Sequence, residues 1–522
     1  MKITLDNKRL HYLFFAFISG LNIFIYFPSF FHIARSDQLP YFLDTSYAHD
    51  WFSLVLNFFS YNRVRLVNIG DITTFRPLLF VLLGTEKWLF GYNFIFWQAL
   101  GVFLHLVLLW WLLKVLLHIY PSLLAYFFIL FFSTLSVLQE MVIWHHINAY
   151  ILFLIFILTA LYYLQLFIEE RQTKLHYLLI ISLCLLFACF IYETGQFFAI
   201  IFWIYTFLFR TSKNKTKFNW KVALLFLAPV AVYICANNLD IFLRNPSIFQ
   251  EQRNIASRIS LGYLLIINHF IRVLVSWFCF GLFPNIFPLQ LSKAYFGERA
   301  HYVINWAALI NGFTIADIVN IISVCILLFA FIKSASFNIL KNRWKFILVI
   351  ISIILIFASI IVLGRTLERG IFITLAFSSY NSYFLWVFFI VIIYSLIDIG
   401  KLRRQNKYIK LILIIAFISL ISLNCYKVYS LNYNYAESIK PNRIFIARLD
   451  RFVNTHKKEP DFSFAFSQHP PEDEIVKFIR VVPISGSHLK KTQDYYYSEI
   501  LYYSYINEEN PKYRLNIIED TN

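Results

Sequence analysis

The chain has 522 residues, of which 59% are hydrophobic and only 14% charged, and its mean hydropathy is +0.64. A soluble protein of this length needs far more polar surface to cover its core, so the composition excludes an ordinary soluble enzyme. The net charge of +17 does not indicate nucleic-acid binding, because most basic residues lie in short loops between apolar segments and no groove-reading motif is present. The sequence therefore predicts a protein embedded in a lipid bilayer.

About eleven apolar segments approach or exceed the ~20 residues that a helix needs to cross a bilayer. In chain order they are 13–33, 93–117, 121–138, 148–168, 175–192, 195–210, 220–238, 313–332, 345–363, 383–400 and 410–426. The composition changes abruptly near residue 430. We expect an all-α polytopic membrane domain over 1–429, followed by a small soluble α+β C-terminal tail over 430–522.

Basic residues fix the orientation of these segments. They cluster before the first segment and in three later loops, at 210–221, 333–345 and 401–410. All four clusters are cytoplasmic if the N-terminus is inside and the eleven spans are right. The long loops 34–92 and 239–312, the short turns 139–147 and 193–194, the loop 364–382 and the tail then lie outside.

The segment 261–283 is apolar enough to span, yet it contains His269 and Arg272. Counting it as a span would place three basic clusters outside. We therefore expect a re-entrant or interfacial helix on the outer side.

Four short motifs follow the first apolar segment. FRPL at 75–78 is followed by LFGYN at 89–93 and by an apolar helix that contains His105; EMVIW at 140–144 and YETG at 192–195 come later. Their order and spacing resemble the "RPL … FG-N … H", short acidic turn and "KET" motifs of GT-C glycosyltransferases. The closest likeness is to the protein O-mannosyltransferase-like and TMTC-like branch, over roughly residues 13–215.

The resemblance implies a GT-C-like helical bundle. It also implies an enzyme that moves a sugar from a polyprenyl-phosphate carrier to an acceptor hydroxyl on the non-cytoplasmic face. An acidic residue of the first outer loop would be the general base. The chain departs from the pattern at Arg35-Ser36-Asp37-Gln38, where many relatives have paired acids, and at Gly101, where Asn is expected. Metal use and the class of acceptor stay open.

Acidic residues on the outer side are the candidates for chemistry. Asp37 follows the first span, where partial dehydration raises the basicity of a carboxylate, and Asp44 or Asp50 could be the base instead. Glu140 and Glu193 each sit in a short turn on the same side, and junctional acids in a membrane bundle often mark function. The alternative is that these acids are simply hydrated at the headgroup level.

Histidines and arginines supply candidate contacts to the substrate. His145 and His146 follow Glu140, but adjacent histidines cannot easily share one ion, so acceptor or phosphate contact is favoured over a divalent metal. A lone His105 in mid-span is more often a packing residue. Arg76, Arg365 and Arg369 are candidates for the donor phosphate, with interfacial snorkelling as the alternative.

Other functions are considered beside this one. One alternative is a polysaccharide polymerase or ligase of the Wzy type, but its key loops would lie late in the chain rather than after the first span. Another is a transporter or flippase, but its sequence would show inverted repeats and helices broken by Gly or Pro at mid-membrane. A catalytically inactive scaffold is a third alternative. Nucleotide-binding and serine-nucleophile motifs do not occur where they could work. We expect a bacterial cytoplasmic membrane location, with the site facing the periplasm.

Overall fold

The structure is a computed structural model that describes residues 8–32, 50–52, 55–56, 76–90, 93–144, 148–169, 175–214, 220–244, 314–335, 337–369 and 379–438, with single residues at 270, 274, 278 and 282. Within these ranges the chain is helical, and the only β feature is an isolated bridge between Ala335 and Ile397.

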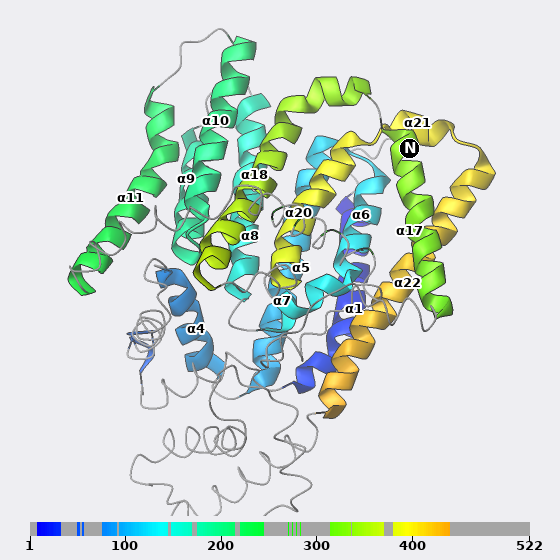
Figure 1. The fold of residues 1–522 in the computed structure, drawn as a ribbon, viewed down its shortest axis with the longest axis horizontal. Coiled ribbons are helices and arrows are strands. Elements are labelled where there is room, and N and C mark those ends of the chain that lie inside the picture. The colour runs from blue at the N-terminus through cyan, green and yellow to red at the C-terminus, as the bar shows by residue number, and fades with distance from the viewer. Residues whose placement is uncertain are drawn as a thin grey trace, which may run out of the picture.

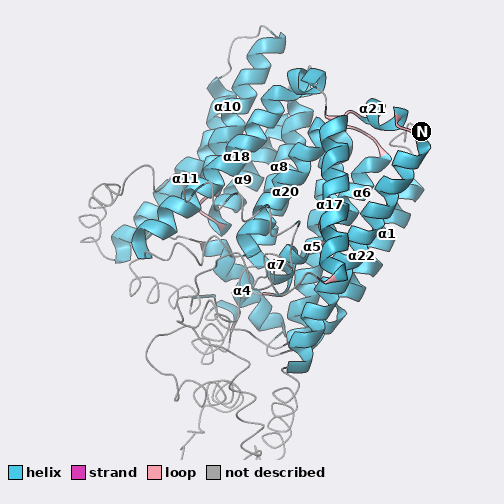
Figure 2. Cartoon of the chain, turned by 45° about the vertical axis from the view of Figure 1, so that its right-hand side comes forward, coloured by secondary structure: helices cyan, strands magenta, loops and turns pink. Residues whose placement is uncertain are grey.

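The helices form one bundle, and most of them run roughly parallel or antiparallel to each other (Figure 1). Figure 2 shows the same arrangement from a second direction. Their bounds are α1 (Lys8–Tyr26), η1 (Phe27–Phe31), α4 (Pro77–Phe90), α5 (Phe94–Ile119), α6 (Leu123–Thr134), η2 (Ser136–Leu138), α7 (Gln139–Ile143), α8 (Asn148–Glu169), α9 (Leu175–Ile191), α10 (Gly195–Asn214), α11 (Trp220–Arg244), α17 (Ile315–Ser334), α18 (Phe337–Arg369), α20 (Ser379–Leu396), α21 (Ile399–Arg404) and α22 (Lys407–Ser438).

Five of the helical segments in the described ranges are long and apolar enough to cross a membrane, and the bent pair of α6 with η2 and α7 would make six. The five are Arg9–Phe31, Phe94–Ile119, Asn148–Ile168, Ile315–Ser334 and Lys407–Glu437. Parts of α9, α10, α11 and α20 are apolar but shorter. The fold is therefore consistent with a helical multi-pass membrane protein, while the predicted number of eleven spans is not confirmed.

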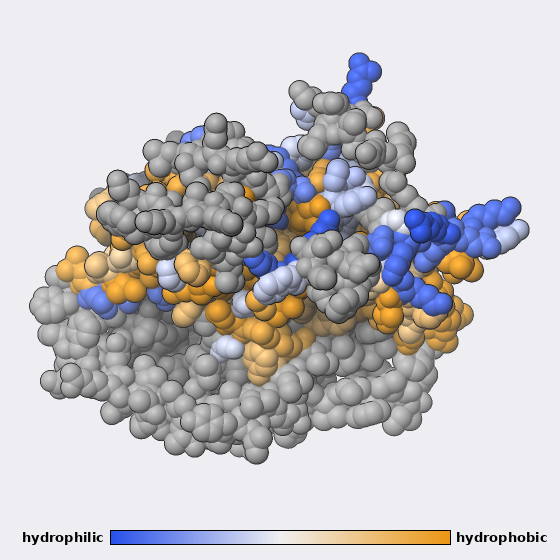
Figure 3. All heavy atoms as spheres, turned by 90° about the horizontal axis from the view of Figure 1, so that it is seen from above, coloured by the Kyte–Doolittle hydropathy of each residue, from blue (hydrophilic) through white to orange (hydrophobic). Residues whose placement is uncertain are grey.

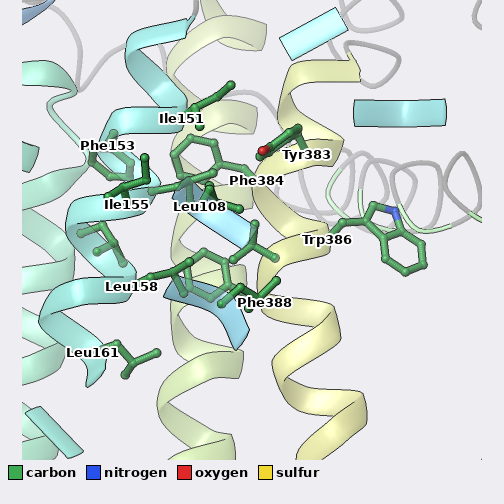
Figure 4. Close-up of a cluster of buried hydrophobic side chains, with 14 of the residues drawn as sticks. Leu108, Ile151, Phe153, Ile155, Leu158, Leu161, Tyr383, Phe384, Trp386 and Phe388 are labelled. Atoms are coloured by element: carbon green, nitrogen blue, oxygen red, sulfur yellow. The ribbon is translucent and has the colours of Figure 1, made fainter. Parts of the chain in front are cut away.

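A cluster of buried hydrophobic side chains lies between α5, α8 and α20 (Figure 4). Leu108, Leu158 and Phe384 are fully or almost fully buried there. Phe384 also stacks on Phe357 of α18, with ring centroids 4.3 Å apart. Because lipid tails are as apolar as these side chains, close packing rather than transfer from water holds such helices together.

Several basic residues lie at one end of the bundle. Arg343 at the start of α18 donates hydrogen bonds to the carbonyls of Ile119 and Ser395, which brings the end of α5 and the end of α20 together. Lys401 bonds the carbonyl of Ala335, and Tyr205, midway along α10, contacts Phe346 near the start of α18. Figure 3 views the molecule from this end and shows hydrophilic residues among the apolar helix sides. Residues of the basic clusters 333–345 and 401–410 thus lie at the same end of the bundle.

The segment expected as one span over 121–138 is broken. The helix α6 ends at Thr134, and the next helical pair is bent from it by 57°. The hydroxyls of Ser133 and Thr134 bond carbonyls of the preceding turn, a bond that competes with the helical ladder and favours a bend. The bend turns α7 into the bundle, so Glu140 is only 7% exposed rather than part of a hydrated turn.

Helix α4 was not predicted, because its fourteen residues are too few for a span and include Glu86 and Lys87. It lies within the region expected as a long outer loop, 34–92. It packs mainly against α9 and α5.

The segment 261–283 contributes four described residues, which are helical and pack against the core: Phe270, Leu274, Phe278 and Leu282. Phe278 stacks on Trp386 of α20 at 5.4 Å, and Asn320 of α17 donates to the carbonyl of Leu282. These four side chains thus face the bundle, and the expected re-entrant or interfacial helix stays a prediction.

Helix α22 continues to Ser438, beyond the expected domain boundary at 430. The remaining tail lies outside the described residues, so the predicted α+β domain stays a prediction.

Candidate functional site

Arg76 and Glu193 form a bidentate ion pair at the end of the bundle opposite the basic loops. The Nε and Nη2 atoms of Arg76 each lie 2.7 Å from an oxygen of the Glu193 carboxylate. Arg76 immediately precedes α4, and Glu193 lies in the turn between α9 and α10. The FRPL and YETG motifs, far apart in the sequence, are thus joined by two charge-assisted hydrogen bonds.

Two tyrosines complete the environment of Arg76. The third guanidinium nitrogen, Nη1, donates to the hydroxyl of Tyr150 at 2.9 Å, and the guanidinium lies 4.7 Å from the ring centre of Tyr192. Burial alone lowers the pKa of Arg76, but the carboxylate of Glu193, helped by the tyrosines, raises it well above its usual value. The arginine is therefore a permanent cation whose charge Glu193 balances.

Glu140 lies beside α5, because α7 packs closely on that helix. A Cβ atom at Gly101 would lie 2.1 Å from the carbonyl oxygen of Val142 and 3.2 Å from the amide nitrogen of Asn148. Gln98, one turn earlier, donates to the carbonyl of Ile143. The position where the resemblance led us to expect Asn must be glycine here, and the amide of Asn148 lies next to it.

His105 lies deeper in the bundle, where it bridges two helices. Its Nδ1 atom is 2.7 Å from the hydroxyl of Tyr383 in α20, and its ring packs edge-on against Tyr26 of α1. The residue is fully buried. This is the geometry of a packed, hydrogen-bonded histidine, and a contact between His105 and substrate stays a prediction.

The other candidates cannot be placed in the same way. Asp37, Asp44, His145 and His146 lie outside the described residues. Arg365 and Arg369 belong to the last turns of α18, where the structure describes the backbone and not the side chains.

Sequence reasoning missed several polar residues of this end of the bundle. Asn148 and Tyr150 lie in the first turn of α8. They were missed because polar residues at the start of an apolar helix are typical of an ordinary helix boundary. His32, Gln139 and Asn432 were also missed, although Asn432 and Asn424 lie on the same buried stripe of α22 and could have drawn attention. No known protein family, curated protein or solved structure matches the chain.

Proposed function

We propose that the protein is a membrane glycosyltransferase that moves a sugar from a polyprenyl-phosphate carrier to an acceptor hydroxyl at the end of the bundle opposite the basic loops. The observation that carries the proposal is the contact between Arg76 and Glu193. It joins two of the motifs on which the GT-C resemblance rests. A third, the acidic turn with Glu140, packs on the helix that contains His105.

The reaction needs a base, a route for the proton and a leaving group. The acceptor oxygen attacks the anomeric carbon of the sugar while a carboxylate of the first outer loop, Asp37 in our proposal, takes its proton. The bond from the anomeric carbon to the phosphate oxygen breaks, and the polyprenyl phosphate leaves with the electron pair. Attack opposite the leaving group inverts the anomeric centre.

The ion pair changes the role proposed for Arg76. A guanidinium already balanced by a carboxylate has little net charge left for a phosphate dianion. We therefore assign Arg76 to holding the Glu193 turn in place, and leave the phosphate to Arg365 and Arg369. Glu140 and Glu193 position the acceptor or stabilise the site.

The test is sugar transfer by purified protein from a panel of radiolabelled polyprenyl-phosphate sugars, with wild type beside Asp37→Asn. We expect transfer by the wild type and loss of transfer in the variant, with donor binding retained. The matched control is Asp398→Asn, because Asp398 caps α21 at the basic end of the bundle and Asn is an equally good cap. The control should transfer at the wild-type rate.

Two outcomes contradict the proposal in different ways. Transfer that survives Asp37→Asn moves the base to Asp44 or another acid. A wild-type protein that binds no donor across the panel removes the glycosyltransferase function and favours a transporter or a scaffold.

A further inference from the structure

Asn432 of α22 joins three segments of the chain at the same end of the bundle as the ion pair. Its side-chain oxygen accepts a hydrogen bond from Nε2 of Gln139 at 2.7 Å, and its side-chain nitrogen donates to the carbonyl of Ile25 at 3.2 Å. Its backbone carbonyl accepts a hydrogen bond from Nε2 of His32 at 2.9 Å. Asn432 is completely buried, and His32 is only 1% exposed.

Each of these contacts is made to a segment that lies next to a residue of the proposed site. Gln139 is the first residue of α7 and precedes Glu140. Ile25 and His32 flank η1, after which the chain continues into the loop that contains Asp37. The ring of His32 also packs edge-on against Tyr435, at 4.6 Å between centroids. The side-chain amide thus links the start of the acidic turn to the end of α1, and the backbone carbonyl of the same residue holds His32, the last described residue before the first outer loop.

Burial of the Asn432 side chain in α22 costs free energy unless its amide forms hydrogen bonds. The buried stripe of this helix recurs every four residues: Ala416, Leu420, Asn424, Val428, Asn432 and Ala436. An asparagine buried in a membrane bundle must find hydrogen-bond partners, and a leucine would fill the same stripe without that need. Since Asn432 finds partners on two other segments, its contribution is to fix where they lie relative to α22.

We propose that Asn432 is a positioning residue: it holds the Glu140 turn and the base of the first outer loop in the relative arrangement that sugar transfer needs. This inference rests on the proposed function. It concerns orientation and not chemistry, because the described hydrogen bonds of Asn432 go to Gln139, Ile25 and His32. A displacement of about 1 Å in such an arrangement can lower turnover on the order of 100-fold.

The experiment uses the full-length protein in lipid nanodiscs and compares Asn432→Leu with Asn424→Leu. Asn424 is the matched control, because it is 2% exposed on the same stripe two turns earlier and forms no hydrogen bond to α7 or η1 among the described residues. Hydrogen exchange is measured on peptides that cover 20–33 and 136–150, and transfer kinetics are measured on the same samples.

For Asn432→Leu we expect faster exchange in both peptides and a kcat lowered by about 10- to 100-fold, with the donor KM unchanged. Gln139→Leu should lower kcat to a similar extent, and the two changes together should cost little more than either alone, because they remove the same hydrogen bond. Asn424→Leu should leave exchange and kinetics as in the wild type.

Three results overturn the inference. Unchanged exchange in Asn432→Leu shows that the three segments are not coupled through this side chain. Faster exchange with unchanged kcat shows a structural role alone. A wild-type protein that transfers no sugar overturns the proposed function and the positioning role with it, while the exchange data still report whether the contact couples the segments.

Discussion

The guanidinium of Arg76 and the carboxylate of Glu193 face each other through two hydrogen bonds of 2.7 Å, across 117 residues of sequence. Their side chains are 12% and 24% exposed, so water only partly solvates either charge. The pair therefore holds the start of α4 against the turn between α9 and α10.

Removing one partner should be worse than removing both. For Glu193→Gln we expect a loss of about 2 kcal/mol in the free energy of unfolding, below the roughly 3–5 kcal/mol for a fully buried pair, because the remaining charge keeps some water. The double variant Arg76→Gln with Glu193→Gln leaves no unbalanced charge and should be more stable than Glu193→Gln alone. Thermal unfolding in detergent measures both, and equal midpoints for the single and double variants would speak against a charge-balanced pair.

Gly101 should tolerate no side chain. In Gly101→Ala the new methyl group would collide with the carbonyl of Val142, and we expect a destabilisation of about 1–3 kcal/mol as α7 is pushed off α5. Gly20 in α1 is the matched control, since a Cβ there meets nothing within 4 Å and alanine is the better helix former. Thermal unfolding of the two variants compares them, and a neutral Gly101→Ala would contradict the close approach.

Arg343 should stabilise the basic end of the bundle. It bonds the last carbonyls of α5 and α20, which have no partner within their own helices. For Arg343→Met, which keeps an apolar stem of similar length, we expect a loss of about 2 kcal/mol, in line with hydrogen bonds to charged groups. Arg404→Met in α21, an exposed arginine at the same end, should unfold at the wild-type temperature. A wild-type midpoint for Arg343→Met would rule out this role.

The orientation of the bundle can be tested by cysteine labelling in a background without the native cysteines. We expect Lys213→Cys and Lys341→Cys to react with an impermeant maleimide only after permeabilisation, and Lys440→Cys to react in intact cells. The contact between Tyr205 and Phe346 puts the first two positions near the same end of the bundle. If 261–283 crossed the membrane, Lys213→Cys and Lys341→Cys would label from opposite sides.

The helices could be predicted from the sequence to within a few residues where an apolar segment is long, as in α5 and α8. The bend within 121–138 was not predicted, because it depends on hydroxyls that bond their own helix and on a neighbour, Gly101, that lets α7 approach. Helix α4 could not be predicted by length, since it packs against other helices without spanning.

The candidate site could be predicted only in part. Arg76 and Glu193 were singled out from separate motifs, but nothing in the sequence indicates that they bind each other, because such a pairing depends on how α4 and α9 pack. His105 illustrates the reverse case: a polar residue in an apolar helix drew attention, and its partner proved to be Tyr383. Asn432 was passed over since an asparagine in a long helix gives no local sign of its partners in other segments.

The bond between His32 and Asn432 joins residues 400 positions apart, and this separation bears on how the protein is made. Helices leave the ribosome in order, so η1 emerges long before its partner in α22 is synthesised. Among the described helices, α17 also packs chiefly against α22. The helix α22, the last one described, therefore closes the bundle at both its α17 side and its η1 side. A chain that stops before residue 407 would be inserted without completing either contact.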